Sequence, residues 1–282
     1  MPELPEVESV ARSLREGLLG RRLEAIQARW AGSLRPSPAT ARRALVGLTL
    51  LAVDRHGKYL FLTFGDAPAG PPRRQLMLHL RMTGQLFTDP AYRPDKHLRL
   101  RFDFDGRRVY YRDIRKFGGF DLLDGLPGRK AIPHVGPDWL ALRFRDWAPR
   151  LDGRRAPIKG LLLDQGVAAG LGNIYADEAL FRAGIHPATP AGALDATARR
   201  RLFDACRRVL RLGIRHGGTT FLDFVDFDGR PGNFRRKLRV YGRTGEPCRA
   251  CGTPLVKTQI AGRGSHFCPR CQPPGLAPPP TP

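Results

Sequence analysis

Residues 97–113, HLRLRFDFDGRRVYYRD, combine an alternating strand pattern with a tight turn. Leucine and phenylalanine alternate with charged residues in the first half, which is typical of a strand with one buried face. Asp105-Gly106, at the centre, is a strong signal for a β-hairpin turn. The stretch therefore predicts an antiparallel hairpin and a larger antiparallel sheet around it.

A second hairpin pattern and one helix pattern precede this stretch. Residues 48–64, LTLLAVDRHGKYLFLTF, form two β-rich runs that are broken around His56-Gly57. The helix pattern runs from Pro5 to Leu19 and is followed by Gly20, which favours a stop. Its apolar residues at helical spacing are Val7, Val10, Ala11, Leu14 and Leu18. We therefore expect residues 1–135 to form an antiparallel β-sandwich with a flanking N-terminal helix.

The pattern changes after residue 135. Glycine and proline are frequent in residues 136–156, which predicts a hinge between domains. Residues 157–240 have a helical pattern, and residues 241–272 contain paired cysteines. The proline-rich composition of residues 273–282 predicts a disordered tail. The expected fold class is α+β with several domains.

Four of the five cysteines form two close pairs. They read C-x2-C-x16-C-x2-C and are Cys248, Cys251, Cys268 and Cys271. This spacing suits one tetrahedral structural zinc per chain, and two disulfides are the alternative, which fits less well without a secretion signal. His266 lies near the cluster, but four thiolates already fill the site, so we expect it in a turn or facing DNA. Cys206 falls on the apolar face of a helix with Leu202 and Val209, which predicts a core thiol.

The net charge narrows the class of partner. The chain has 48 Lys and Arg residues against 26 Asp and Glu residues, a formal charge of +22. Such an excess points to a polyanion, either nucleic acid or an anionic membrane surface. No apolar run approaches the 18 residues that a membrane span needs, so nucleic acid is the better prediction.

The first eight residues, MPELPEVE, allow two interpretations. Pro5 and Glu6 suit the first turn of an ordinary helix, but this leaves Pro2 and Glu3 unexplained. Removal of Met1, favoured by a small following residue, would instead expose the amine of Pro2. An α-amine has a pKa of about 7.7–8.0 against about 10.4 for lysine, so far more of it is free base at neutral pH. A free amine can attack an aldehyde-like carbon to form a Schiff base, and Glu3 could move protons beside it.

Several segments together resemble one known family. They are MPELPEVE, HGKYL, HLRMTGQL, RDIRKFGGF, GLGNIYADEALFRAGIHP and YGRTGEPCRACGTPL. In this order, from residue 1 to about residue 272, they resemble the bacterial formamidopyrimidine-DNA glycosylase family. The resemblance implies an N-terminal β-sandwich, a helix-two-turns-helix domain and a C-terminal zinc finger. It also implies excision of oxidised purines such as 8-oxoguanine and formamidopyrimidines from duplex DNA, with strand cleavage by β,δ-elimination. We accordingly expect a monomer that binds damaged double-stranded DNA and works in the bacterial cytoplasm, at the nucleoid.

The resemblance also assigns roles around the reacting nucleotide. Pro2 is the residue that attacks C1′, Glu3 handles protons, and Glu6 supports the site. Lys58, counted among the catalytic residues, contacts DNA beside the lesion, and Lys159 supports the site near the damaged base. From the residues alone, both lysines are better explained as solvated surface charges.

A second set of residues is implied in holding the DNA. Base excision requires the nucleotide to be flipped out of the duplex, and a wedge of Met82, Arg115 and Phe117 would fill the hole. Without the resemblance, Met82 and Phe117 read as core residues.

Three further positions are implied to contact DNA. Asn173 suits the N-cap of a helix and donates to a phosphate in the family. Arg263 is expected at the tip of a finger hairpin, where it counts among both the catalytic and the DNA-binding residues, and flanking glycines would allow close approach. His97 is also expected to bind DNA, although Lys96 stands where the family often has a preceding histidine.

Two alternatives remain open from the sequence. The endonuclease VIII-like branch prefers oxidised pyrimidines, but ELPEVE and the segment GGTTFLDFVDFDGRPGNF look closer to the purine-lesion branch. A non-enzymatic zinc-finger DNA-binding protein would explain the charge and the four cysteines. It would leave Pro2 and Glu3 without a role.

Overall fold

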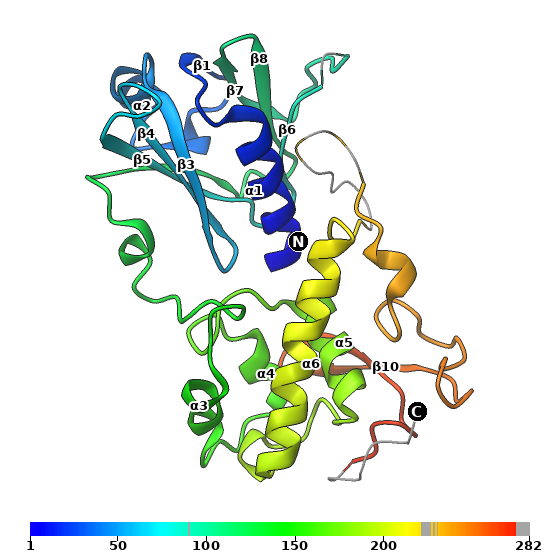
Figure 1. Cartoon of the computed structure of the whole chain (residues 1–282). Coiled ribbons are helices and arrows are strands. Elements are labelled where there is room, and N and C mark those ends of the chain that lie inside the picture. The colour runs from blue at the N-terminus through cyan, green and yellow to red at the C-terminus, as the bar shows by residue number, and fades with distance from the viewer. Residues whose placement is uncertain (90, 221–226, 228, 230, 275–282) are drawn as a thin grey trace. The chain divides into compact units, whose positions relative to one another are not determined.

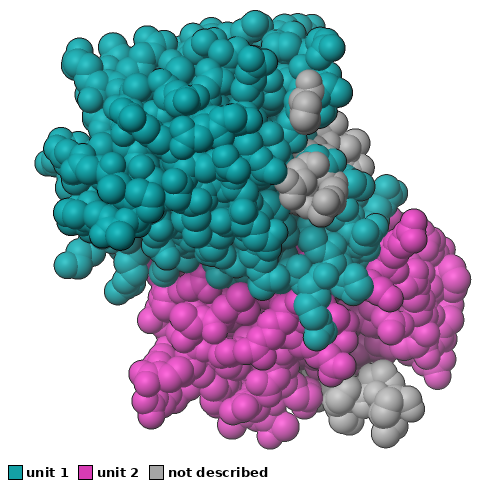
Figure 2. Space-filling model, turned by 45° about the horizontal axis from the view of Figure 1, so that its top comes forward, with its two compact units in different colours: residues 1–133, 214–235 teal, residues 134–213, 236–282 magenta. Residues whose placement is uncertain are grey.

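The computed structural model describes the chain except for residues 90, 221–226, 228, 230 and 275–282. It divides into two compact units, coloured teal and magenta in Figure 2. Unit 1 comprises residues 1–133 and 214–235, and unit 2 comprises residues 134–213 and 236–282. The first boundary lies close to the predicted one, but the return of residues 214–235 to unit 1 was not predicted. Most of the predicted tail lies outside the described residues.

Unit 1 contains two sheets that form a β-sandwich (Figure 1). The four-stranded sheet has the order β1-β7-β8-β6, and the five-stranded sheet has the order β2-β9-β5-β4-β3. Neighbouring strands are antiparallel except for the parallel pair β2 and β9. The strands are β1 (Leu23–Ala28), β2 (Leu34–Arg35), β3 (Thr49–His56), β4 (Tyr59–Gly65), β5 (Pro72–His79), β6 (Gly84–Phe87), β7 (Leu98–Phe104), β8 (Arg107–Asp113) and β9 (Gly119–Leu123).

Both predicted hairpins are present. β7 pairs with β8 across Asp105-Gly106, where Gly106 has a φ of +65°, a conformation that favours glycine. β3 pairs with β4 across Gly57-Lys58. Leu98, Leu100, Phe102 and Phe104 are all buried, as their alternation predicted. Together with side chains of the other sheet, most of them form one hydrophobic core.

Helix α1 (Leu4–Leu18) packs into this core through its predicted apolar stripe. The helix begins one residue before Pro5, because Glu3 is its N-cap. A second helix in unit 1, α2 (Pro38–Leu45), is capped by Ser37. The burial of the α1 stripe fixes the first residues of the chain against the sandwich, where a terminus would otherwise fray.

Unit 2 is helical and ends in a two-stranded hairpin. Its elements are α3 (Phe144–Trp147), α4 (Ile158–Leu163), α5 (Asn173–Ala183), β10 (Val256–Ile260) and β11 (Arg263–Phe267), and the long helix α6 (Ala196–Arg215) runs from it into unit 1. Short 3₁₀ turns lie at Ala31–Ser33, Gly128–Ala131, Ala148–Leu151, Ala191–Ala193 and Phe234–Lys237. The expected hinge over residues 136–156 is not a free linker, because Trp139 and Trp147 are buried against Phe203 with ring centroids 5.6–5.7 Å from it. Cys206 is fully buried on α6, which confirms the predicted core thiol.

Among the described residues, no helix is long and apolar enough to cross a membrane. The observed fold is therefore the predicted α+β arrangement: a β-sandwich with a flanking helix, a helical part and a terminal β-hairpin with paired cysteines.

Candidate active site and DNA interface

The N-terminus of unit 1 is held by a capping box. The backbone N–H of Glu3 donates to Oε2 of Glu6 at 2.8 Å, and Pro2, Glu3 and Glu6 are all buried, whereas Met1 is exposed. A capping box satisfies backbone donors that a helix start would otherwise leave without partners. The residue types and the spacing of MPELPEVE therefore place Pro2 at a fixed position beside two carboxyl groups.

Glu6 also fastens a distant segment of the same unit. Its Oε1 accepts the backbone N–H of Thr219 at 2.6 Å. Gly218 has a φ of +82°, and a Cβ there would lie 2.8 Å from the Glu6 side chain. Sequence reasoning did not find this contact, because Gly217-Gly218 predicts a turn but does not indicate what the turn packs against.

Lys58 occupies the turn between β3 and β4 and is 5% exposed, so the alternative of a solvated hairpin lysine is wrong. Its charge lies close enough to His79 to affect that imidazole. The pKa of His79 is lowered to about 3, first by burial and then by the charges of Arg81 and Lys58. His79 is therefore neutral at physiological pH, and its Nδ1 accepts the N–H of Arg81 at 2.9 Å. In a neutral imidazole whose Nδ1 accepts a hydrogen bond, the proton is on Nε2. The contact with Arg81 therefore fixes the tautomer of His79.

The predicted wedge residues form one exposed cluster on two loops. Met82 is 43% and Phe117 is 56% exposed. Arg115 lies between them, with Nη1 3.0 Å from the sulfur of Met82 and its guanidinium carbon 4.5 Å from the centre of the Phe117 ring. The interpretation of Met82 and Phe117 as core residues, which their hydrophobicity alone suggested, is therefore wrong.

Asp113 joins the two wedge loops and was not singled out from the sequence. It is fully buried and accepts hydrogen bonds from the hydroxyl of Thr83 at 2.5 Å and the backbone N–H of Gly118 at 2.9 Å. Its Oδ1 also accepts the N–H of Arg115 at 3.2 Å. One carboxylate thus binds the side chain of Thr83 in one wedge loop and the backbone of the other loop at Arg115 and Gly118. An aspartate at a strand end carries no sequence signal for this role.

His97 directly precedes β7 and is half-buried. Its N–H donates to Oδ1 of Asp95 at 2.9 Å, and its carbonyl accepts the N–H of Asp113 at 3.0 Å. The adjacent Lys96 is exposed, so its positively charged side chain is at the surface next to His97.

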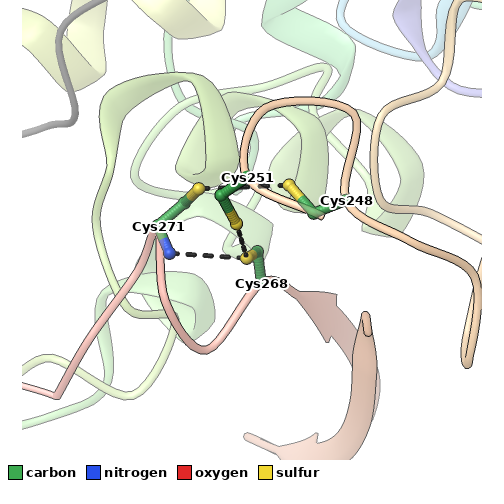
Figure 3. A group of neighbouring side chains, drawn as sticks. All are labelled: Cys248, Cys251, Cys268 and Cys271. Carbon is green, nitrogen blue, oxygen red and sulfur yellow. Dashed lines mark hydrogen bonds between the residues drawn. The ribbon is translucent and has the colours of Figure 1, made fainter. Parts of the chain in front are cut away.

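The four paired cysteines meet in unit 2, as Figure 3 shows. Their sulfur atoms all lie within 4.8 Å of one another. Cys248 and Cys271 are 3.9 Å apart and Cys251 and Cys268 are 3.4 Å apart, too far for disulfide bonds of about 2.05 Å. Zinc–sulfur bonds of about 2.3 Å in a tetrahedron place neighbouring sulfurs about 3.8 Å apart, so the donor set and its geometry fit Zn²⁺. This is the site of one structural zinc.

The finger hairpin carries Arg263 where the sequence placed it. β10 and β11 are joined by Ala261-Gly262, both with positive φ, and Arg263 follows at the exposed start of β11. This is the backbone of a tight two-residue hairpin turn. His266 differs from expectation: it is buried on β11, not in a turn or facing solvent, and its N–H donates to Asp177 at 2.9 Å.

Asn173 and Lys159 both bind the backbone of this hairpin. The N-cap of α5 is Gly172 and Asn173 is its first helical residue, one position later than predicted. The side-chain amide of Asn173 donates to the carbonyl oxygen of Gly264 at 2.9 Å. Lys159 is completely buried and pairs with Asp177 at 2.6 Å, so the alternative of a solvated lysine is wrong here too.

Family models match three consecutive parts of the chain. They are described as the formamidopyrimidine-DNA glycosylase N-terminal domain (residues 1–120), the formamidopyrimidine-DNA glycosylase H2TH domain (residues 135–224) and a zinc finger found in FPG and IleRS (residues 245–274). Together they cover most of the chain.

Whole relatives are similar along nearly their full length. A formamidopyrimidine-DNA glycosylase of Symbiobacterium thermophilum is 44% identical, with 97% of this chain and 90% of the relative covered. One of Latilactobacillus sakei is 42% identical, with 96% and 98% covered. Among solved structures, a Lactococcus lactis FPG mutant in complex with Fapy-dG containing DNA has a TM-score of 0.89 at 33% identity, covering 96% of this chain and all of that one. The MutM (FPG) protein of Thermus thermophilus has a TM-score of 0.85 at 39% identity, covering 98% and 100%.

Proposed function

The chain belongs to the formamidopyrimidine-DNA glycosylase family, and from this premise we propose that it excises oxidised purines from duplex DNA and then cleaves the strand. It is a DNA glycosylase of base excision repair with one structural zinc and damaged double-stranded DNA as its partner. The preference for 8-oxoguanine and formamidopyrimidines, the roles of single residues and the course of the reaction are the proposal.

The buried, capped N-terminus is the observation that carries the mechanism. After removal of Met1, the secondary amine of Pro2 attacks C1′ of the damaged nucleotide, and the bond from C1′ to the base breaks. Glu3, adjacent to Pro2, supplies and withdraws protons during base loss. The capping contact to Glu6 supports this role, because general acid–base catalysis needs groups that are held in place.

Strand cleavage follows from the same covalent intermediate. The C1′–O4′ bond then breaks and O4′ takes a proton, so the ring-opened sugar is linked to Pro2 as an iminium ion, which makes the proton on C2′ acidic. Loss of that proton expels the 3′ phosphate in β-elimination, and a second elimination expels the 5′ phosphate. Water then releases Pro2 from the remaining sugar fragment.

The remaining site residues have proposed roles in holding DNA. The wedge of Met82, Arg115 and Phe117 fills the space that the flipped nucleotide leaves, and its exposure and mutual contacts support this role. Arg263 and Asn173 contact phosphate, which positions the duplex without reading its sequence. Lys58 and His97 contact the strand near the lesion. We further propose that the protein acts as a monomer in the cytoplasm of a bacterium, at the nucleoid.

Borohydride reduction tests this proposal because it converts an iminium ion into a stable covalent adduct. Protein without Met1 and protein that retains it are mixed with duplex DNA containing 8-oxoguanine opposite cytosine. We expect an adduct that maps to Pro2 for the processed protein alone, because the nitrogen of Pro2 is an amide when Met1 is present. As a control, we measure the binding of the Met1-retaining protein to abasic DNA. This binding should persist, so a missing adduct would reflect lost chemistry and not lost binding.

Two outcomes would contradict the proposal. Full trapping with Met1 in place would exclude Pro2 as the nucleophile. Faster excision of an oxidised pyrimidine than of 8-oxoguanine would instead favour the endonuclease VIII-like specificity. The second comparison is needed because a Lactococcus lactis relative has been crystallised with oxidised-pyrimidine DNA.

A further inference from the structure

A buried ion pair lies behind the finger hairpin in unit 2. Lys159 of α4 and Asp177 of α5 are both fully buried, and Nζ of Lys159 is 2.6 Å from Oδ1 of Asp177. Burial of a charged pair is costly unless further polar contacts compensate the loss of water. Packing alone therefore does not explain why a charged pair is buried at this position.

The ammonium group also contacts the hairpin. It donates to the carbonyl oxygen of Gly264 at 3.0 Å and to the hydroxyl of Ser265 at 2.7 Å. The other carboxylate oxygen of Asp177 accepts the backbone N–H of His266 at 2.9 Å. Three consecutive residues of β11, directly after Arg263, are thus attached to one ion pair.

The same short stretch receives the neighbouring DNA-contact candidate. The Gly264 carbonyl that accepts from Lys159 also accepts from the side chain of Asn173 at 2.9 Å. α4 packs closely on the hairpin turn as well, since a Cβ on Gly160 would lie 3.2 Å from the Cβ of Ala261. The backbone beside Arg263 is therefore fixed to α4 and α5 by several contacts.

A two-stranded hairpin has little stability of its own, so its two ends need separate supports. Cys268 follows directly on the last residue of β11, so the zinc site holds the base of the hairpin. The ion pair holds the end that carries Arg263. The zinc ligands lie at the base and not at the end that carries Arg263, whereas a phosphate contact requires a defined position there.

We propose that Lys159, through its ion pair with Asp177, is a positioning residue that holds the end of the finger hairpin so that Arg263, beside Asn173, can bind the DNA backbone. It does not itself touch DNA, because it is completely buried. The inference rests on the proposed function, in which Arg263 and Asn173 contact phosphate.

The test is a double-mutant cycle on the full zinc-loaded chain. Lys159→Met with Asp177→Asn removes both charges together, since removal of only one would leave an uncompensated buried charge. Asn keeps an oxygen for the N–H of His266. Each protein is measured for zinc content, thermal unfolding and affinity for a duplex containing a stable abasic analogue, over a range of salt concentrations.

We expect the charge-free pair to weaken binding about tenfold in the wild-type background and less than about twofold in the Arg263→Ala background. The charge-free pair and Arg263→Ala should each reduce the slope of log K against log salt by about 0.9, which corresponds to the loss of one phosphate contact. The two changes combined should reduce the slope no further. Ser265→Ala leaves the ion pair intact but removes the hydroxyl that accepts from Lys159 at 2.7 Å and donates to the carbonyl oxygen of Arg263 at 3.1 Å. It should show a smaller loss with the same dependence on Arg263, and it tests the support of the hairpin end if the charge-free pair fails to fold.

Lys257→Met is the matched control. Lys257 is an exposed lysine of β10 that is not part of the ion pair, and methionine keeps an unbranched side chain beside Gly264, so the replacement removes a charge from the same hairpin. Its effect on affinity should simply add to that of Arg263→Ala.

Equal losses from the charge-free pair with and without Arg263 would refute the inference while leaving the phosphate contact of Arg263 intact. An unchanged affinity and salt slope for Arg263→Ala alone would refute the phosphate role in the proposed function, and the inference with it. Unchanged binding by a folded charge-free pair and by Ser265→Ala would also refute the inference.

Discussion

Glu3 lies between Pro2, the proposed nucleophile, and helix α1, of which Glu3 is the N-cap. Its backbone N–H is bound to Glu6, and it is 2% exposed. A buried group next to a capped helix start is held in place, and a general acid–base residue needs to be held in place.

We predict that Glu3→Gln lowers base excision by roughly 100- to 10,000-fold, the range for loss of acid–base catalysis. Glutamine keeps the size and the hydrogen-bonding capacity of the side chain but cannot exchange a proton. Affinity for lesion duplex should not fall, because one negative charge is removed from a protein that binds a polyanion. Single-turnover excision and equilibrium binding measure the two effects. Wild-type excision rates in the variant would rule out this role.

Single residues also mark where sequence reasoning succeeds and fails. The cysteine spacing was sufficient to predict the metal site, because ligand geometry imposes its own pattern on the sequence. Hydrophobicity alone misplaced Met82 and Phe117, because an exposed wedge and a core use the same residue types. Asp113 carries no pattern for its role, because its contact with Thr83 joins two loops that are 30 residues apart.

At the scale of elements, α1 and the segment containing Gly217-Gly218 form one assembly within unit 1. The helix and its stripe could be predicted from periodicity, and both hairpins from alternation and turn residues. The partner of Glu6 could not, because Thr219 lies more than 200 positions away and local patterns do not report such pairing. For the same reason, the sequence did not predict that residues 214–235 belong to unit 1 or that residues 136–156 pack as core.

We predict that Gly218→Ala slows excision about tenfold more than Gly217→Ala, because a small displacement of catalytic groups costs this much or more. Both glycines have positive φ, +82° and +70°, so the backbone strain of alanine is similar at the two sites. Only at Gly218 would the added Cβ approach Glu6, at 2.8 Å; at Gly217 the nearest atom is 3.7 Å away. Single-turnover rates and thermal unfolding separate catalysis from stability. Equal rates for the two variants would show that the Glu6 contact does not support the site.

At the scale of the whole molecule, the two units have different proposed tasks. Unit 1 contains Pro2, Glu3 and the wedge, and unit 2 contains the zinc site, Asn173 and Arg263. The sandwich core of unit 1 needs no metal, whereas the finger within unit 2 has a small core that is built largely from the zinc ligands themselves. Loss of zinc should therefore affect one task and spare the other.

We predict that zinc removal, or Cys248→Ser, weakens binding to lesion duplex by about tenfold or more, because zinc-binding free energy is folding free energy for such a finger and the hairpin carries Arg263. At saturating DNA, however, borohydride trapping at Pro2 should persist, since unit 1 retains its fold and its N-terminus. Titration with lesion duplex, followed by trapping at saturation, measures both. Added zinc should restore the affinity of the metal-depleted wild type but not that of Cys248→Ser. Normal affinity without metal would show that the finger is not needed for binding, and loss of trapping at saturation would show that the chemistry in unit 1 depends on the finger after all.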